Sequence, residues 1–282
     1  MTARDMTDPD MTEPDKTARH LTTAHRVLWV SAHPSRESLT VHLREEGIAH
    51  LRARGVEVVE SDLYAMGWDP VLAPEPFARD GEPFHPVSSV RRAYLEQRLP
   101  EDIAQEQEKL RGIDALVLQF PLWWYGMPAI MKGWFDRVFH SGFAFGTDPV
   151  SGERLRFENG PFRGVRALTA ITLGDRPGAI GPRGKSGEFH QLMFGLLHGT
   201  LAYTGLDVLA PFAVPGADHL RGDDVPEVAE RLRRRLDGLY AEPPIAYRPQ
   251  FTGEYTEEWE LADHVRPGES GLDVHIRRPD EP

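Results

Sequence analysis

The sequence contains no cysteine, which excludes disulfide bonds, thiolate metal sites and cysteine nucleophiles. Its twelve histidines form no pair at helical metal-ligand spacing within an acidic cluster, so no metal centre is expected. No apolar run approaches the roughly 20 residues that span a bilayer, and residues 1–15 lack the basic and apolar regions of a signal peptide. The net charge of -12 gives no basic field to attract nucleic acid. We therefore expect a cytoplasmic protein with no membrane span and no nucleic-acid partner.

The chain divides into three regions by composition. Residues 1–24 repeat Met and Thr among Asp and Pro, and they carry too little apolar surface to offset the entropy of ordering. We expect them to form a disordered acidic leader. Residues 25–240 hold enough apolar residues for one sizeable core. Residues 241–282 form a C-terminal extension, which is expected to pack on the domain or on a partner subunit because its scattered aromatic residues need burial. These aromatic residues are Tyr247, Phe251, Tyr255 and Trp259.

Short apolar runs alternate with amphipathic segments through the middle region. The runs predict five buried parallel strands at 27–32, 56–60, 115–120, 165–172 and 208–211. The segments between and after them predict helices from Ser38 to about Gly55 and at 101–111, 128–139, 188–203 and 225–240. This alternation indicates a doubly wound α/β fold, with a five-stranded parallel sheet and helices on both faces. Ligands of such folds bind beyond the carboxyl ends of the strands.

The loop after the first strand, residues 32–40, has the composition of a phosphate site. It presents hydroxyl groups and backbone N–H groups at a helix N-terminus, with Ser38 as a plausible N-cap. An ordinary capped helix with a loop histidine would have the same residues, so both interpretations remain open.

Three consecutive aromatic residues, Trp123, Trp124 and Tyr125, follow the third strand. Aromatic side chains at this edge can form a wall beside a planar ring, and backbone N–H groups in the turn can bind the heteroatoms of that ring. Core filling is the alternative, but three neighbours cannot easily face one core. A ligand surface or a dimer surface is therefore favoured.

The loop after the fourth strand, residues 172–187, is dense in glycine and carries three cations, Arg176, Arg183 and Lys185. Such a loop can approach a ligand closely and supply N–H donors and positive charge. A flexible surface turn remains the alternative.

A resemblance to a known family rests mainly on residues 120–139, which read FPLWWYGMPAIMKGWFDRVF. Residues 60–66 and the pair Ala32-His33 agree with it. Over residues 26 to about 240 the chain resembles the flavodoxin-like NAD(P)H:quinone oxidoreductases. The resemblance implies a flavodoxin-like fold, a flavin that is FAD or alternatively FMN, NAD(P)H as co-substrate, and a homodimer with its active site at the interface.

The resemblance also implies site residues. The flavin diphosphate would lie near His33, Ser38, Leu39 and Thr40. The ring would lie against Pro121, Leu122, Trp123, Trp124 and Tyr125, with its edge completed by Thr172, Leu173 and Gly174. The catalytic residues would be Trp124, Tyr125, Phe145 and Lys185, with Phe145 closing the substrate chamber of the other subunit.

The implied mechanism is ping-pong: NAD(P)H gives a hydride to flavin N5, and a quinone or similar planar acceptor then takes it. Members of the family carry a tyrosine and a histidine in the loop after the fourth strand, and this sequence aligns Ile180 and Ser186 there. Arg183, Lys185 or His190 are candidates to replace them. Two other functions stay open: a regulatory flavoprotein subunit without efficient turnover, and a pathway-specific reductase of one natural product.

Overall fold

A parallel β-sheet organises the fold. The computed structural model describes residues 24–79 and 81–281, so the expected leader lies outside the described residues except for its last residue. Strands pair in the order β2-β1-β3-β6-β7, and β8 also pairs with β6, all in parallel. This is the flavodoxin-like strand order. The six strands are β1 (Arg26–Ser31), β2 (Glu57–Asp62), β3 (Ala115–Pro121), β6 (Arg166–Leu173), β7 (Asp207–Val208) and β8 (Phe212–Pro215).

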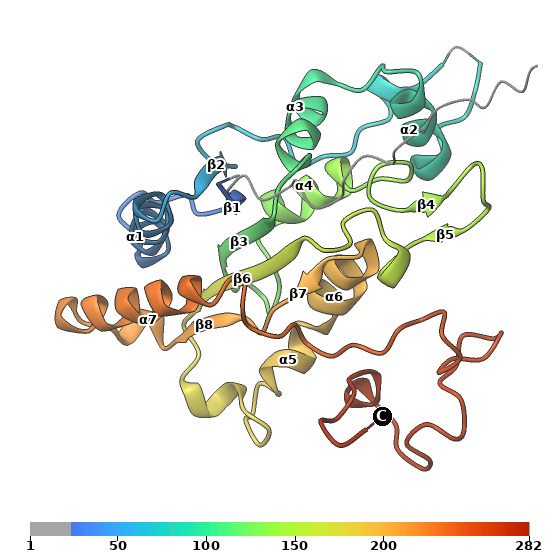
Figure 1. Ribbon diagram of the computed structural model, residues 1–282. Coiled ribbons are helices and arrows are strands. Elements are labelled where there is room, and N and C mark those ends of the chain that lie inside the picture. The colour runs from blue at the N-terminus through green and yellow to red at the C-terminus, as the bar shows by residue number, and fades with distance from the viewer. Residues whose placement is uncertain (1–23, 80, 282) are drawn as a thin grey trace, which may run out of the picture.

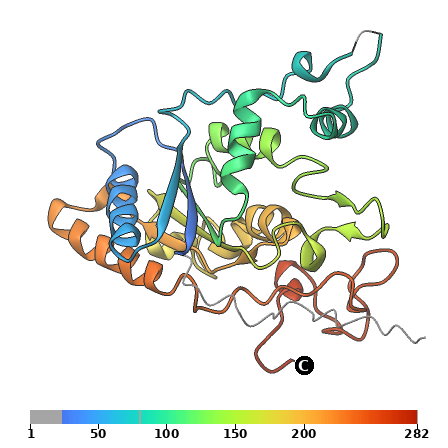
Figure 2. The same ribbon diagram turned by 45° about the horizontal axis from the view of Figure 1, so that its top comes forward.

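Helices cover both faces of the sheet, as Figures 1 and 2 show. One face packs against α1 (Leu39–Ala53) and α7 (Val225–Asp237). The other packs against α2 (Pro86–Leu95), α3 (Glu101–Leu110), α4 (Ala129–Val138) and α6 (Phe194–Leu196). The short α5 (Phe189–Leu192) precedes α6. The predicted doubly wound fold is confirmed.

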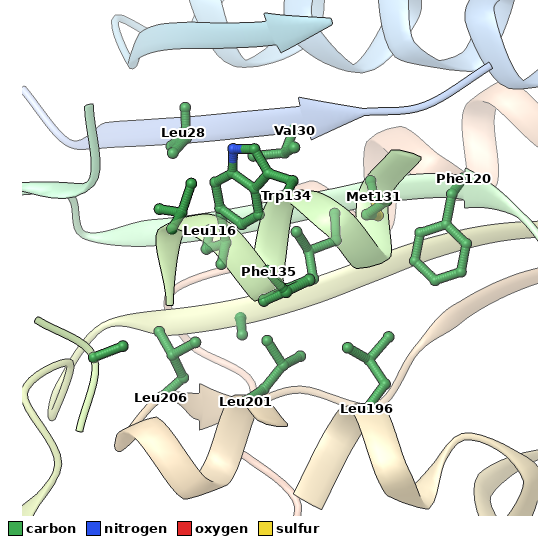
Figure 3. Close-up of a cluster of buried hydrophobic side chains, with 14 of the residues drawn as sticks. Leu28, Val30, Leu116, Phe120, Met131, Trp134, Phe135, Leu196, Leu201 and Leu206 are labelled. Atoms are coloured by element: carbon green, nitrogen blue, oxygen red, sulfur yellow. The ribbon is translucent and has the colours of Figure 1, made fainter. Parts of the chain in front are cut away.

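Successive strand residues point to opposite faces, which is why these strands are apolar throughout. In β1, Leu28 and Val30 face the α4 side, whereas Val27 and Trp29 face α1 and α7. Trp134 of α4 is fully buried in the hydrophobic core on the α4 side of the sheet. Figure 3 shows it between β1 and the segment that carries Leu196 and Leu201.

Two predicted elements differ from the structure, and two were missed: the helix α2 and a short hairpin. The strand expected at 208–211 is split into β7 and β8, because Pro211 has no N–H to donate to the sheet. The helix expected at 188–203 is broken into α5, α6, a π-helical turn (Leu197–Leu201) and a 3₁₀ turn. The interior glycines at 195 and 199 disfavour a regular helix. An antiparallel hairpin of β4 (Gly146–Thr147) and β5 (Arg154–Leu155) was not predicted.

The C-terminal extension contacts the domain at several points. The N–H of Ile245 donates to the carbonyl of Val208 at 2.7 Å, and the N–H groups of Gln250 and Phe251 donate to the Glu158 carboxylate at 3.0 and 2.7 Å. Within the extension, Arg248 is 3% exposed, and its guanidinium donates to the carbonyl of Val274 at 2.6 Å. Polar contacts rather than regular secondary structure hold this segment.

Within the described ranges, no helix has both the length and the apolar character needed to cross a membrane. Those ranges also contain no cluster of three or more His, Asp or Glu side chains arranged to hold a metal ion.

Candidate functional site

Three loops meet at the carboxyl edge of the sheet because β1, β3 and β6 are parallel neighbours. Ser31 lies beside Gln119, and Pro121 lies beside Thr172, so the strands end at nearly the same level. The loops that follow them are residues 32–38, 122–128 and 174–188. This is the edge at which doubly wound folds bind ligands.

A buried hydrogen-bond network fixes the start of α1 against β3 and β6. The indole N–H of Trp29 donates to Gln119 Oε1 at 2.9 Å, and the Gln119 amide donates to the carbonyl of Thr40 at 2.8 Å. The hydroxyls of Thr40 and Thr172 are 2.8 Å apart and buried. Breaking a buried bond leaves its partner without a hydrogen bond, so the network resists movement of α1. The sequence analysis did not single out Gln119, although it is a polar residue in an apolar strand.

The N-terminus of α1 has Ser38 as its N-cap, as predicted. The Ser38 hydroxyl accepts a hydrogen bond from the N–H of Val41 at 3.2 Å. The N–H groups of Leu39 and Thr40 bond to no other group among the described residues. Unpaired N–H groups at a helix start attract phosphate through the hydrogen bonds they can donate and through the helix dipole.

A cavity of about 470 Å³ opens beside this helix start. His33 and Arg36 line it, together with Arg44, Asp62 and Tyr64. Arg44 is paired with Asp62 and also reaches Ser31 Oγ, whereas Arg36 is exposed. The predicted site residues did not include Arg36 and Arg44. A cation two residues before the N-cap and another in the second turn of the helix are the signal that could have found them.

The three aromatic residues after β3 form a tight turn that faces solvent. The N–H and carbonyl groups of Trp123 exchange hydrogen bonds of 3.0 Å with those of Gly126. Trp124 and Tyr125 have φ values of 51° and 57°, a conformation that costs a non-glycine residue about 1–2 kcal/mol. Trp123, Trp124 and Tyr125 are 43%, 99% and 47% exposed. Strain and exposed aromatic surface together mark a functional site better than a folding element.

The turn contacts the glycine-rich loop after β6. The Tyr125 hydroxyl lies 3.0 Å from Ser186 Oγ and 3.3 Å from Asp175 Oδ2. At the other side, the N–H of Leu122 donates to the carbonyl of Thr172 at 2.8 Å. A side chain at Gly174 would lie 2.4 Å from the carboxylate of Asp218, so a larger residue here would displace that carboxylate. The structure therefore brings together the predicted residues of all three loops.

The candidates for the missing tyrosine and histidine of the family lie apart from one another. Ile180 is buried in the core on the α4 side, and Ser186 contacts Tyr125. Lys185 is exposed and forms no ion pair with the described residues. The His190 ring contacts the Glu188 carboxylate at 3.1 Å. Burial raises the pKa of Glu188, but hydrogen bonds from Gln191 and His190 outweigh it and leave the pKa below its ordinary value.

Phe145 does not lie beside the aromatic turn of its own chain. It follows the C-terminal end of α4, whereas the turn precedes the N-terminal end, and a ten-residue helix is about 15 Å long. Phe145 lines a separate cavity of about 280 Å³, where its ring centroid is 5.7 Å from that of Tyr203.

The comparisons with known proteins agree with this geometry. The family model described as "Flavodoxin-like fold" matches residues 25–238. The chain is 32% identical to NAD(P)H dehydrogenase (quinone) 1 of Cavia porcellus over 270 residues, which cover 92% of this chain and 96% of the relative. It is 34% identical to the Rattus norvegicus protein of the same name over 259 residues, covering 88% and 92% of the two chains.

The solved structure of a putative quinone reductase from Klebsiella pneumoniae superposes with a TM-score of 0.86 at 37% identity, covering 90% of this chain and 100% of that one. An NAD(P)H:quinone oxidoreductase from Methanothermobacter marburgensis superposes with a TM-score of 0.58 at 25% identity, covering 78% and 99%. Fold, motif and relatives coincide over most of the chain, and the protein belongs to the flavodoxin-like family of NAD(P)H:quinone oxidoreductases.

Proposed function

We propose that this protein is a flavin-dependent NAD(P)H:quinone oxidoreductase that works by a ping-pong cycle on quinones or similar planar acceptors. The observation that carries the proposal is the exposed and strained aromatic turn at residues 123–126, which lies at the same edge of the sheet as a helix start with unpaired N–H groups. Together they offer a flat apolar wall and an anion site at one edge of the sheet. A planar ring attached to a phosphate fits both.

The residues present fit a flavin. Ser38, Leu39 and Thr40 at the start of α1 would hold its phosphate, and the turn after β3 would lie against its ring. When bound, the flavin supplies two-electron hydride transfer. We favour FAD over FMN because the cavity at the helix start continues past His33 and Arg36 to Tyr64, which gives room for a diphosphate and more.

The protein's own groups would orient and shield the reacting rings. Trp124 and Tyr125 supply aromatic surface, and the backbone N–H groups of the loop after β6 face the same edge. Lys185 is a free cation on that loop that would stabilise negative charge on a reduced ring. These groups would act by their position around the flavin ring and not by transferring protons. The conformation of the loop after β6 would therefore have a larger effect on the reaction rate than the pKa values of its side chains.

We further propose a cytoplasmic homodimer with shared active sites. Phe145 and Tyr203 line an open cavity, and the aromatic turn of the same chain is not among the residues that line it. A partner subunit would bring its turn to this wall. Val87, which lines the same cavity, is 60% exposed, as expected of a surface that a second chain covers.

Mixing two inactive variants tests the shared site. Trp124→Ala and Phe145→Ala should each lose most quinone turnover. In a heterodimer of the two variants, one site contains both substitutions and the other contains neither. If the two variants are co-expressed in equal amounts, about half of the dimers are heterodimers, so about a quarter of all sites should be active. No restoration, with heterodimers demonstrated, would place both residues in one chain's site. Val150→Ala, at a 94% exposed apolar residue outside the three loops, is the matched control and should keep full activity.

A further inference from the structure

The phenol of Tyr125 links the aromatic turn after β3 to the loop after β6. The Tyr125 hydroxyl reaches Asp175 at the beginning of the loop after β6 and Ser186 at its end. The phenol has one proton, so it can donate to the Asp175 carboxylate while its oxygen accepts from the Ser186 hydroxyl, and a single side chain spans the mouth of a loop of about a dozen residues. Within the loop, Ile180 is buried in the core on the α4 side.

The loop itself is compact but weakly attached. The N–H of Ser186 donates to the carbonyl of Ala179 at 2.9 Å, and the N–H of Gly216 donates to the carbonyl of Asp175 at 2.7 Å. A side chain at Gly184 would lie 2.1 Å from the carbonyl oxygen of Ala179, so the loop folds closely onto itself. Its three exposed cations repel one another and favour opening.

The aromatic turn needs a compensating contact. Tyr125 is held at a positive φ, although its side chain is only half-buried and packs poorly. Such strain persists only where surrounding contacts determine it. The bridge from Tyr125 to Asp175 and Ser186 is the contact that ties this strained residue to the rest of the fold.

We propose that Tyr125 is a positioning residue whose hydroxyl, through Asp175 and Ser186, latches the loop at 175–186 over the aromatic turn and so limits the site to small planar acceptors. The inference rests on the proposed function and names the device that sets its acceptor specificity. Without the latch, the loop opens, its N–H groups leave the ring edge, and thicker or larger acceptors enter.

Two readouts test the latch, one of them without turnover. Limited trypsin digestion reports loop opening through cleavage after Arg183 and Lys185, and it is followed by mass spectrometry of the intact holoprotein. Tyr125→Phe should speed cleavage at these bonds about two- to tenfold, the equilibrium effect of one lost hydrogen bond. The same variant should raise KM for menadione by a similar factor. It should also reduce the preference for one-ring benzoquinone over three-ring anthraquinone.

Companion variants separate a latch from a general structural effect. Ser186→Ala should behave like Tyr125→Phe, and the double variant should be no worse than either alone. Asp175→Asn keeps an acceptor oxygen and should rescue most of the loss seen in Asp175→Ala. Ser151→Ala removes a hydroxyl that bonds only within a distant turn, and it should change neither readout.

The outcomes separate the latch from the proposed function. Wild-type protein that fails to reduce quinones contradicts the proposed function, while the trypsin readout still tests the latch. Active wild type with unchanged loop cleavage in Tyr125→Phe contradicts the latch alone. Additive effects in the double variant also contradict it, because they would show that Tyr125 and Ser186 act separately.

Discussion

Acid should destabilise this protein through His198, a partly buried histidine in the π-helical turn. Its ring stacks on Phe194 with centroids 4.6 Å apart and meets the rings of Tyr247 and His275 of the C-terminal extension at 4.8 and 6.1 Å. Its Nε2 atom is buried and has no hydrogen-bond partner among residues 24–79 and 81–281. Burial, with a smaller contribution from His275, lowers the pKa of His198 from 6.5 to about 4.

The sign and size of the effect follow from proton binding. Between pH 6.5 and pH 4, His198 is protonated in the unfolded chain but mostly neutral in the folded chain. The free energy of unfolding is therefore highest above pH 6.5 and falls as the pH drops towards 4. From these two pKa values, the loss is about 2 kcal/mol at pH 5 and about 3 kcal/mol at pH 4. Burial also lowers the pKa of His140, and burial followed by Arg248 lowers that of His275, so both add to the acid loss.

The substitution His198→Phe isolates the contribution of His198. Phenylalanine keeps the stacking on Phe194 and has no group to protonate. Urea unfolding followed by tryptophan fluorescence at pH 7 and pH 5 should show the variant losing about 2 kcal/mol less than wild type. His42→Gln is the control, because His42 is exposed on α1 and is solvated in both states. Parallel pH profiles for wild type and His198→Phe would refute the reasoning.

Three further predictions concern the site and its support. Trp124→Gly should raise stability by about 1 kcal/mol, because it removes the strain of a positive φ, yet it should weaken flavin binding; urea midpoints and flavin fluorescence titration measure the two effects. Gln119→Leu should cost about 1–3 kcal/mol for each buried group it leaves unpaired, at Trp29 and Thr40, and unchanged stability in urea would contradict the network. Gly133→Ala should cost about 1–3 kcal/mol, since its Cβ would lie 2.1 Å from the Pro70 carbonyl oxygen, which thermal unfolding can check.

Local sequence patterns were enough to predict the sheet and the exposure of the aromatic turn. Buried parallel strands appear as continuous apolar runs, so β1, β3 and β6 were found to within a residue or two. The turn was predicted because three adjacent aromatics cannot face one core, and Trp124 is indeed 99% exposed.

Contacts that depend on register or on a second chain could not be predicted. Gln119 and Thr40 are 79 residues apart, and Tyr125 and Ser186 are 61 apart, so only the folded strand order brings them together. The split of the last strand was likewise missed because the effect of Pro211 depends on where the strand pairs. The role proposed for Phe145 would involve a second chain, which the pattern of one sequence does not describe.

The most direct test of the proposed function is the absorbance spectrum of purified protein, recorded anaerobically as NADPH and then menadione are added. We predict a yellow flavin band that bleaches with NADPH and returns with menadione. A bound flavin that never bleaches, or protein that binds no flavin, would contradict reductase function and favour a regulatory role for this fold.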